Sequence, residues 1–468
     1  VAPTGAPSVK IPSLPSLRVA STGFPLPEKE FTMRKPLTAA IGLVLAALSC
    51  DVLAITDTET NASIPFSFTS PGARSLGMAG AFVGLADDAT AAYTNPAGLT
   101  QLRQTEISLE GRHTQFDTPF VDGGTFTEAP FNDAGIGTGH DSSAKTNPSF
   151  LSVVFPFERW ALALYRHELA RYHTEFTNPN ALEGDTIFLF PFSAKADLKI
   201  VNYGVSAGFK VNDALSLGVG LSRYDFKFDT IAARFDYDNA GNAFPVSAQQ
   251  QQGDDNGIGW NLGARWSLSE SMSLGAIYRR APRFDYDAAA VLLDPNGAVT
   301  ASSQFRGVRF DVPDVWGAGL TWRPSDAWLV SFDLDRVRYS QLTDGIQSLF
   351  AIQSSTDRLQ IPDGTEIHLG TEYTWTDMAH PFSLRGGVWR DPRHSIEFSG
   401  TPRSGCTSAN AVDCAGDTAL AALFSQGRGP ETHWSIGAGM AFKNFQVDLA
   451  GDFSKAVDTW SLSGVYRF

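Results

Sequence analysis

From residue 104 onward, apolar and polar side chains alternate in repeated stretches, each at least about as long as the 9–11 residues of a tilted membrane-spanning strand. In 148–157, Leu151, Val153, Phe155 and Phe157 share one face, because successive side chains of a strand point to opposite sides. The stretches cover 104–116, 148–157, 160–176, 197–210, 214–229, 257–268, 272–287, 309–323, 327–340, 364–375, 381–391, 432–442, 445–453 and 459–468. The pattern predicts fourteen strands, each with one apolar and one polar face.

Short turns and long connections alternate between these strands. The long ones cover 117–147, 177–196, 230–256, 288–308, 341–363 and 392–431. A transmembrane β-barrel has short turns at one end and long loops at the other, whereas a soluble β-sandwich would not segregate its loops in this way. Mean hydropathy is only −0.11, which fits a barrel because half of each strand faces a polar lumen. We therefore expect residues 104–468 to form an antiparallel transmembrane β-barrel.

The N-terminal region is typical of export. Met33-Arg34-Lys35 starts a basic segment and 37–48 is mostly apolar, so 33–54 is interpreted as a signal peptide, too short to span a bilayer. Residues 1–32 are interpreted as a mis-called start or a non-native extension, the alternative being a genuine disordered extension. Cys50 leaves a lipoprotein as a further alternative. These features place the protein in the outer membrane of a Gram-negative bacterium.

Charge and cysteine content narrow the class further. The net charge of −14 argues against a nucleic-acid partner. Cys406 and Cys414, in an exported chain, are expected to form a disulfide. The polar strand faces carry both charge signs, and we interpret them as an ion-paired lumen that grips a plug rather than as a catalytic cluster. The inward residues expected from the alternation include Asn261, Arg265, Asp333, Asp335, Glu366, His368, Glu372, Asp448 and Asp452.

The segment 55–103 does not alternate, is rich in small residues, and is expected to fold as a plug inside the lumen. Its run of small residues, followed by Asn95-Pro96-Ala97, resembles the N-terminal hatch of the FadL family of outer-membrane long-chain fatty-acid and aromatic-hydrocarbon transporters. The terminal Phe468 also resembles the signal read by the barrel-assembly machinery. The resemblance implies passive uptake of a hydrophobic ligand, which binds in a pocket and leaves sideways through a gap made by a kink in strand three.

Strand three has a local counterpart of that kink, because alternation is lost over 165–173. A bulge there would turn both Arg166 and His167 toward the lumen, the alternative being a strand end outside the membrane. If the ligand is a carboxylate, we also expect a buried arginine along its path. The candidate ligand-binding residues are Phe66, Phe68, Arg166, His167, Arg171, Arg279 and Arg309.

The sequence gives no catalytic constellation that fits its context. Residues 204–208 match G-x-S-x-G, but they continue a strand where a nucleophile elbow needs a strand-to-helix turn. We predict no enzyme, no cofactor and no metal. Long-chain fatty acid is the expected ligand. The alternatives are a channel for aromatic or aliphatic hydrocarbons, an outer-membrane phospholipase, and a general porin. We expect a monomer in contact with outer-membrane lipid and lipopolysaccharide.

Overall fold

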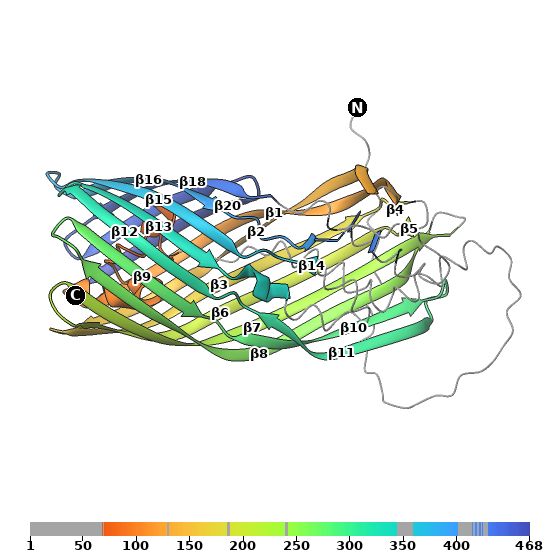
Figure 1. Ribbon diagram of the computed structural model, residues 1–468, viewed down its shortest axis with the longest axis horizontal. Helices are drawn as coiled ribbons and strands as arrows, with labels where there is room; N and C mark the ends of the chain where they lie inside the picture. The colour runs from red at the N-terminus through yellow and green to blue at the C-terminus, as the bar shows by residue number, and fades with distance from the viewer. Residues whose placement is uncertain are drawn as a thin grey trace, which may run out of the picture.

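Backbone hydrogen bonds join the strands of the computed structural model into one antiparallel barrel that closes where β1 pairs with β20 (Figure 1). Glu106 faces Arg467 and Phe116 faces Val457 along this seam. The structure describes residues 70–128, 131–184, 188–238, 242–343, 359–400 and 429–468, with Phe68 and a few residues between 414 and 424. The predicted fourteen-stranded antiparallel wall is confirmed.

The sheet has more segments than the wall has strands, because two wall strands are interrupted and β4 and β5 are short additions. The wall strands are β1 (Glu106–Glu128), β2 (Phe131–Pro156), β3 (Trp160–Asn178), β6 (Phe192–Lys210), β7 (Leu215–Tyr237), β8 (Ala243–Ser267), β9 and β10 (Met272–Arg280 and Arg283–Leu293), β11 and β12 (Val299–Asp311 and Val315–Ser325), β13 (Trp328–Val337), β15 (Gly364–Trp375), β16 (Phe382–Asp391), β18 (Glu431–Ala441), β19 (Phe445–Phe453) and β20 (Val457–Arg467). The other elements are α3 (Ala73–Gly77), α4 (Ala91–Thr94), η1 (Pro96–Gln101), β4 (Leu182–Glu183), β5 (Phe188–Leu189), η2 (Tyr339–Thr343), and a separate pair of β14 (Leu359–Gln360) and β17 (Glu397–Phe398). Within the described part of the chain, no helix is long and apolar enough to cross a bilayer.

The short turns and the C-terminus lie at one end of the barrel (Figure 1). At this end the outer face carries an apolar band. Its exposed side chains include Leu109, Leu151, Phe155, Leu164, Val205, Leu221, Ile258, Leu262, Phe332, Leu369, Ile436 and Leu462, with tryptophans at 160, 266, 322 and 328 near the turns. An outward apolar band with aromatic residues at its edge is the lipid-facing surface of a transmembrane barrel.

Several strands continue well beyond this band, which corrects the predicted connections. Most of 117–147, 230–256 and 288–308 is strand rather than loop. The register of β1 with β2 runs from Glu106↔Val154 to Glu128↔Phe131. Outside the membrane both strand faces can be polar, so the alternation fades while the hydrogen-bond ladder goes on. The sequence pattern therefore marked the membrane-spanning part of each strand rather than the whole strand.

Two neighbouring wall strands are interrupted at the same level by proline. Pro282 separates β9 from β10, and Pro313 lies between β11 and β12. Proline lacks the N–H that a ladder needs. Arg279 still pairs with Val315 below the break, and Arg283 pairs with Asp311 above it.

A third irregularity lies between β2 and β3. These strands pair only from Pro156↔Ala161 to Phe150↔His167. Beyond that point the described residues of β2 pair with β1, and those of β3 pair with β6. On the side away from the short turns, the unpaired stretch between β2 and β3 ends where β4 pairs with β1 at Gly124↔Leu182. The wall thus has a stretch without backbone pairing, which we call the β2–β3 window.

Candidate ligand path

The N-terminal segment 70–102 lies against the inner face of the strands. Most of its residues are buried, and Met78, Phe82, Leu85 and Leu99 are all fully inaccessible. A Cβ at Gly218 would come within 2.3 Å of the Ala97 amide nitrogen, and one at Gly263 within 2.2 Å of Asn95 Oδ1. Glycine at these wall positions therefore lets the segment's backbone approach closely.

Asn95 connects this segment to the wall. Its side-chain amide donates to the carbonyl oxygens of Val83 (3.0 Å) and of Ala264 on β8 (3.1 Å). Its Oδ1 accepts from the amide of Ala97 (3.2 Å) and so begins η1 at Pro96. Asn95, Pro96 and Ala97 therefore set both the turn and its contact with the barrel.

Charged groups add a second set of contacts. Arg74 in α3 donates to Asp87 (2.6 Å) and to Glu372 on β15 (2.9 and 2.8 Å). Arg385 on β16 bridges Glu372 (2.6 Å) and Asp448 on β19 (2.8 Å). The side chains of Arg385 and Asp448 are each only 1% exposed. The sequence predicted that Glu372 and Asp448 face inward. In the structure both carboxylates take part in an ion-paired network around the segment 70–102.

The β2–β3 window arises from extra residues on both of its edges. The β3–β6 register shifts between Glu168 and Ala170, so Leu169 is the unmatched residue. The β1–β2 register shifts between Glu110↔Phe150 and Gly111↔Pro148, so Ser149 is unmatched. Bulges bend the strand that carries them and re-aim its side chains. Two bulges at one level therefore part β2 from β3.

The window is only partly bridged by side chains. Thr174 Oγ1 donates to Asp141 (2.6 Å), and Asn147 donates to Glu168. Nearer the short turns, Leu151 and Leu164 are exposed on the outer face. The window thus begins at the edge of the apolar band.

An internal cavity of about 130 Å³ reaches this window. At the window side its wall includes Ser149, Glu168, Leu169 and Ala170. At the inner side it includes Phe68, Tyr339 and Trp389. The cavity therefore connects the interior near the N-terminal segment with the opening in the wall.

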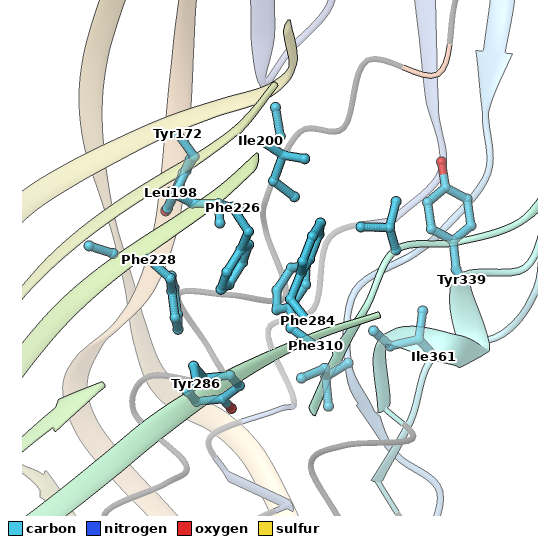
Figure 2. Close-up of a cluster of buried hydrophobic side chains, with 14 of the residues drawn as sticks. Tyr172, Leu198, Ile200, Phe226, Phe228, Phe284, Tyr286, Phe310, Tyr339 and Ile361 are labelled. Atoms are coloured by element: carbon cyan, nitrogen blue, oxygen red, sulfur yellow. The ribbon is translucent and has the colours of Figure 1, made fainter. Parts of the chain in front are cut away.

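A large apolar cluster lies deeper along the lumen, shown in Figure 2. The Phe226 and Phe284 rings stack at 4.7 Å, and Phe310 lies 5.2 Å from Phe226. Leu169 and Phe68 belong to the same cluster. We call it the aromatic cluster. Because it contains Leu169 of the window and Phe68 of the cavity lining, apolar packing extends from the lumen to the wall opening.

Arg279 lies inward on β9 beside this cluster. It is 6% exposed. Its guanidinium carbon lies 4.1 Å from the centre of the Tyr93 ring, and Nη1 approaches the Phe68 carbonyl at 3.4 Å. Nε has no hydrogen-bond partner. Among the described residues no carboxylate lies within ion-pair distance of Arg279, whereas the buried Arg112 has one such partner and the buried Arg385 has two.

His167 is the second predicted ligand residue that lies in the lumen. It is 1% exposed, its ring centre is 4.1 Å from that of Tyr93, and neither ring nitrogen has a hydrogen-bond partner. The expectation that Arg166 also turns inward is wrong. The bulge follows Glu168, so Arg166 keeps the parity of the outer face and folds over to the Pro148 carbonyl and to Glu168 (3.3 Å).

The remaining predicted residues are dispersed. Arg171 lines the cavity but is paired with Asp197. Partial burial raises the pKa of Asp197, but hydrogen bonds from Arg171 and His173 outweigh this effect and hold the pKa below its ordinary value. Arg309 is partly exposed and lies 3.4 Å from Asp311.

Phe68 is buried edge-on against Tyr339 at 6.0 Å, and Phe66 lies outside the described residues. Cys414 is disulfide-bonded, but its expected partner, Cys406, also lies outside them. Sequence reasoning missed Leu169 and Ser149, because the extra residue in a bulge has no signature of its own. A signal for part of this site was present in Pro148, which cannot donate to a ladder.

The closed barrel, its apolar outer band and the cavity that reaches its wall are those of a transport protein of the Gram-negative outer membrane. A family model described as Outer membrane protein transport protein (OMPP1/FadL/TodX) matches residues 54–395. The chain therefore belongs to this family, whose members are channels that carry hydrophobic substrates across the outer membrane.

Individual relatives are distant. The long-chain fatty acid transport protein of Escherichia coli O6:H1 is 23% identical over 352 residues, which cover 64% of this chain and 73% of that protein. The crystal structure of a Pseudomonas aeruginosa FadL homologue is similar at a TM-score of 0.62 and 17% identity, covering 86% of this chain and 99% of the other. The Pseudomonas putida toluene transporter TodX is similar at a TM-score of 0.56 and 16% identity, covering 86% and 99%. These structures show a shared fold.

Proposed function

We propose that this protein is a passive uptake channel for long-chain fatty acids. The observation that carries the proposal is Arg279, a buried guanidinium without a carboxylate partner among the described residues, adjoining the aromatic cluster through Phe68. A carboxylate would supply the missing charge-assisted hydrogen bonds, and the cluster would receive the acyl chain.

Apolar burial favours a long ligand in this path. Each buried methylene contributes about 0.8 kcal/mol, so a long acyl chain gains more than one aromatic ring. The cavity of about 130 Å³ is smaller than the roughly 300–1,000 Å³ of ordinary ligand pockets. We therefore infer that Phe68 and its neighbours shift when a ligand enters.

We propose that residues 55–103 act as the hatch and that the ligand leaves through the β2–β3 window. The cavity reaches the window, and the window begins where the apolar band ends, which supports sideways release toward lipid. With the segment 70–102 packed against the wall, water and ions should leak little. Transport by this route needs only a concentration gradient, and we propose no cofactor and no catalytic step.

A hydrocarbon channel is the second candidate, because solved structures of similar fold include a toluene transporter. A neutral ligand would leave Arg279 without its proposed role. A phospholipase would need a serine–histidine pair facing lipid. Ser206, the serine of the G-x-S-x-G match, instead lies inward on β6 and donates to the Ala92 carbonyl (2.6 Å).

The proposal is tested by growth. A bacterial strain that lacks its own fatty-acid transporter should grow on oleate as sole carbon source only when it carries this protein. Native mass spectrometry of the purified protein should show a bound fatty acid. If the strain fails on oleate but takes up toluene or alkanes, the hydrocarbon channel is correct and the fatty-acid assignment is wrong.

Replacing Arg279 separates the two ligands. We expect Arg279→Gln to weaken oleate binding about tenfold or more, because hydrogen bonds to charged groups contribute about 1.5–3 kcal/mol. Arg279→Lys should restore part of the affinity, and toluene binding should be unchanged in both variants. Binding can be measured by quenching of tryptophan fluorescence.

Arg223→Gln is the matched control, because Arg223 is 60% exposed and lies on the outer face. Equal oleate affinity of wild type and the Arg279→Gln variant would remove the carboxylate role from Arg279.

The remaining expectations concern processing and assembly. We propose that 33–54 is removed as a signal peptide. Phe468 is 62% exposed and packs edge-on against Tyr466 at 4.9 Å. That exposure supports its recognition by the barrel-assembly machinery, and loss of Phe468 should lower the amount of protein in the outer membrane. We propose a monomer surrounded by lipid and lipopolysaccharide.

A further inference from the structure

Two carboxylates and one imidazole converge in the lumen, and one of them, Glu366, lines the same cavity as Phe68. Asp335 on β13 and Glu366 on β15 are direct cross-strand neighbours, and His368 is two residues further along β15. They are 6%, 3% and 0% exposed. One potential ligand atom from each lies within 4.8 Å of the other two. Like charges directly opposite each other destabilise a sheet unless a cation separates them.

The orientation of His368 is fixed by the N-terminal segment. Nδ1 lies 2.7 Å from the carbonyl oxygen of Ala79, so this nitrogen carries the proton and donates it. Nε2 then points at the carboxylates, 3.4 Å from Glu366 Oε2 and 3.9 Å from Asp335 Oδ2. A metal-binding histidine typically donates its other ring nitrogen to a carbonyl in this way.

The histidine nitrogen that faces the centre of this cluster lacks a hydrogen-bond partner. His368 Nε2 is buried without one in the described structure. The gaps of 3.4 and 3.9 Å are long for direct hydrogen bonds. They are close to the separation of about 3.3 Å between two ligands of a tetrahedral ion whose bonds are about 2.0–2.1 Å.

The surroundings support an ion at this point. Tyr339 donates to the other oxygen of Glu366 at 2.8 Å and so orients that carboxylate. The His368 ring stacks on Trp389 at 5.2 Å. Glu366, Tyr339 and Trp389 all line the cavity, which provides an entry path.

We propose that Asp335, Glu366 and His368 bind one divalent cation of the zinc class. One imidazole and two carboxylates are ligands that Zn²⁺ and Co²⁺ accept, and three protein ligands leave one coordination position open. The site would join β13 and β15 to the N-terminal segment through Ala79. It differs from the sequence-based expectation of a protein without a metal site, and it does not depend on which ligand the channel carries.

The test uses the full chain without a histidine tag, purified in detergent and stripped with a chelator. Zn²⁺ is titrated by calorimetry, bound metal is counted by mass spectrometry, and Co²⁺ is followed by its visible d–d absorption. We expect one equivalent of Zn²⁺ in wild type. His368→Gln and Glu366→Gln should each lower the affinity by at least the roughly 10–100-fold that loss of a supporting residue costs.

His433→Gln is the matched control. His433 is also buried and stacks on the same Trp389 at 4.0 Å, but it has an ordinary partner in Asp452 at 2.7 Å. This variant should keep the full equivalent of Zn²⁺. Heat-shift on SDS gels verifies that each variant is folded, and the near-isosteric Glu366→Gln gives the readout if His368→Gln does not fold. Wild type that binds no Zn²⁺, or equal binding by wild type and the His368→Gln and Glu366→Gln variants, would overturn the proposal and leave a protonated imidazole between the carboxylates.

Discussion

Deleting Leu169 is expected to abolish growth on oleate while leaving a folded barrel. Leu169 is the residue of β3 that has no partner on β6. Its removal would make Glu168 and Ala170 consecutive, straighten the strand and bring its upper part toward β2. Ligand could then still enter the lumen but would lose its way out through the wall. The measurement is growth on oleate together with oleate binding to the purified protein.

Leu169→Ala is the control for this deletion, because it removes the side chain but keeps the extra residue and hence the bulge. It should still support growth on oleate, with somewhat weaker binding, because the Leu169 side chain also lines the cavity and belongs to the aromatic cluster. Retained binding with lost growth in the deletion variant would support exit through the β2–β3 window. Normal growth of a folded deletion variant would show that the ligand leaves by another route.

The second large effect is expected at Asp448. Asp448→Ala removes one of the two carboxylates that contact Arg385, whose side chain is 1% exposed. Arg385 keeps its second partner, Glu372, so the cost is about that of one buried hydrogen bond to a charged group, about 1.5–3 kcal/mol, rather than that of a buried charge left alone. We expect the free energy of unfolding in urea to fall by this amount. Ion conductance in planar bilayers should rise, since Arg385 and Arg74 share Glu372.

Two control variants test whether the loss of stability in Asp448→Ala comes from the buried ion pair. Asp448→Asn keeps the shape and one hydrogen-bond acceptor, so it should cost less than the alanine variant. Asp225→Ala breaks the pair of Arg223 and Asp225, which are 60% and 46% exposed, and exposed pairs contribute only about 0–1 kcal/mol. If Asp448→Ala and Asp225→Ala destabilise equally, the buried network does not hold the barrel and its N-terminal segment together.

The membrane-spanning wall could be predicted from the sequence because lipid imposes a strict period of two. Leu151 and Phe155 alternate with Ser152 and Val154, and the structure places the first pair outward and the second pair inward. The strand extensions could not be predicted, because water on both faces removes that constraint. Lys227 and Asp254, for example, both lie exposed on paired strands outside the band.

The candidate site was less accessible to sequence reasoning. Alternation gives the face of a residue but not the partner it meets. Asp335 and Glu366 were assigned to the lumen, yet their cross-strand register and the approach of His368 depend on the alignment of two strands. The face of Arg166 was assigned incorrectly because a bulge one residue earlier or later reverses it. The ligand role of Arg279 stays a prediction, and its burial agrees with that role.

The contacts of the segment 70–102 also constrain the order in which the chain can fold. The Ala73 amide donates to Ser463 on β20, 390 positions away, while Asn95 contacts β8, 169 positions away. Contacts between residues so distant in sequence carry a high loop-closure entropy and form late. The strand residues that contact this segment come together only after strands from both halves of the chain have paired. Closure of the barrel and docking of the segment 70–102 are therefore one cooperative event. Substitutions at Gly218 or Gly263 should slow assembly before they affect transport.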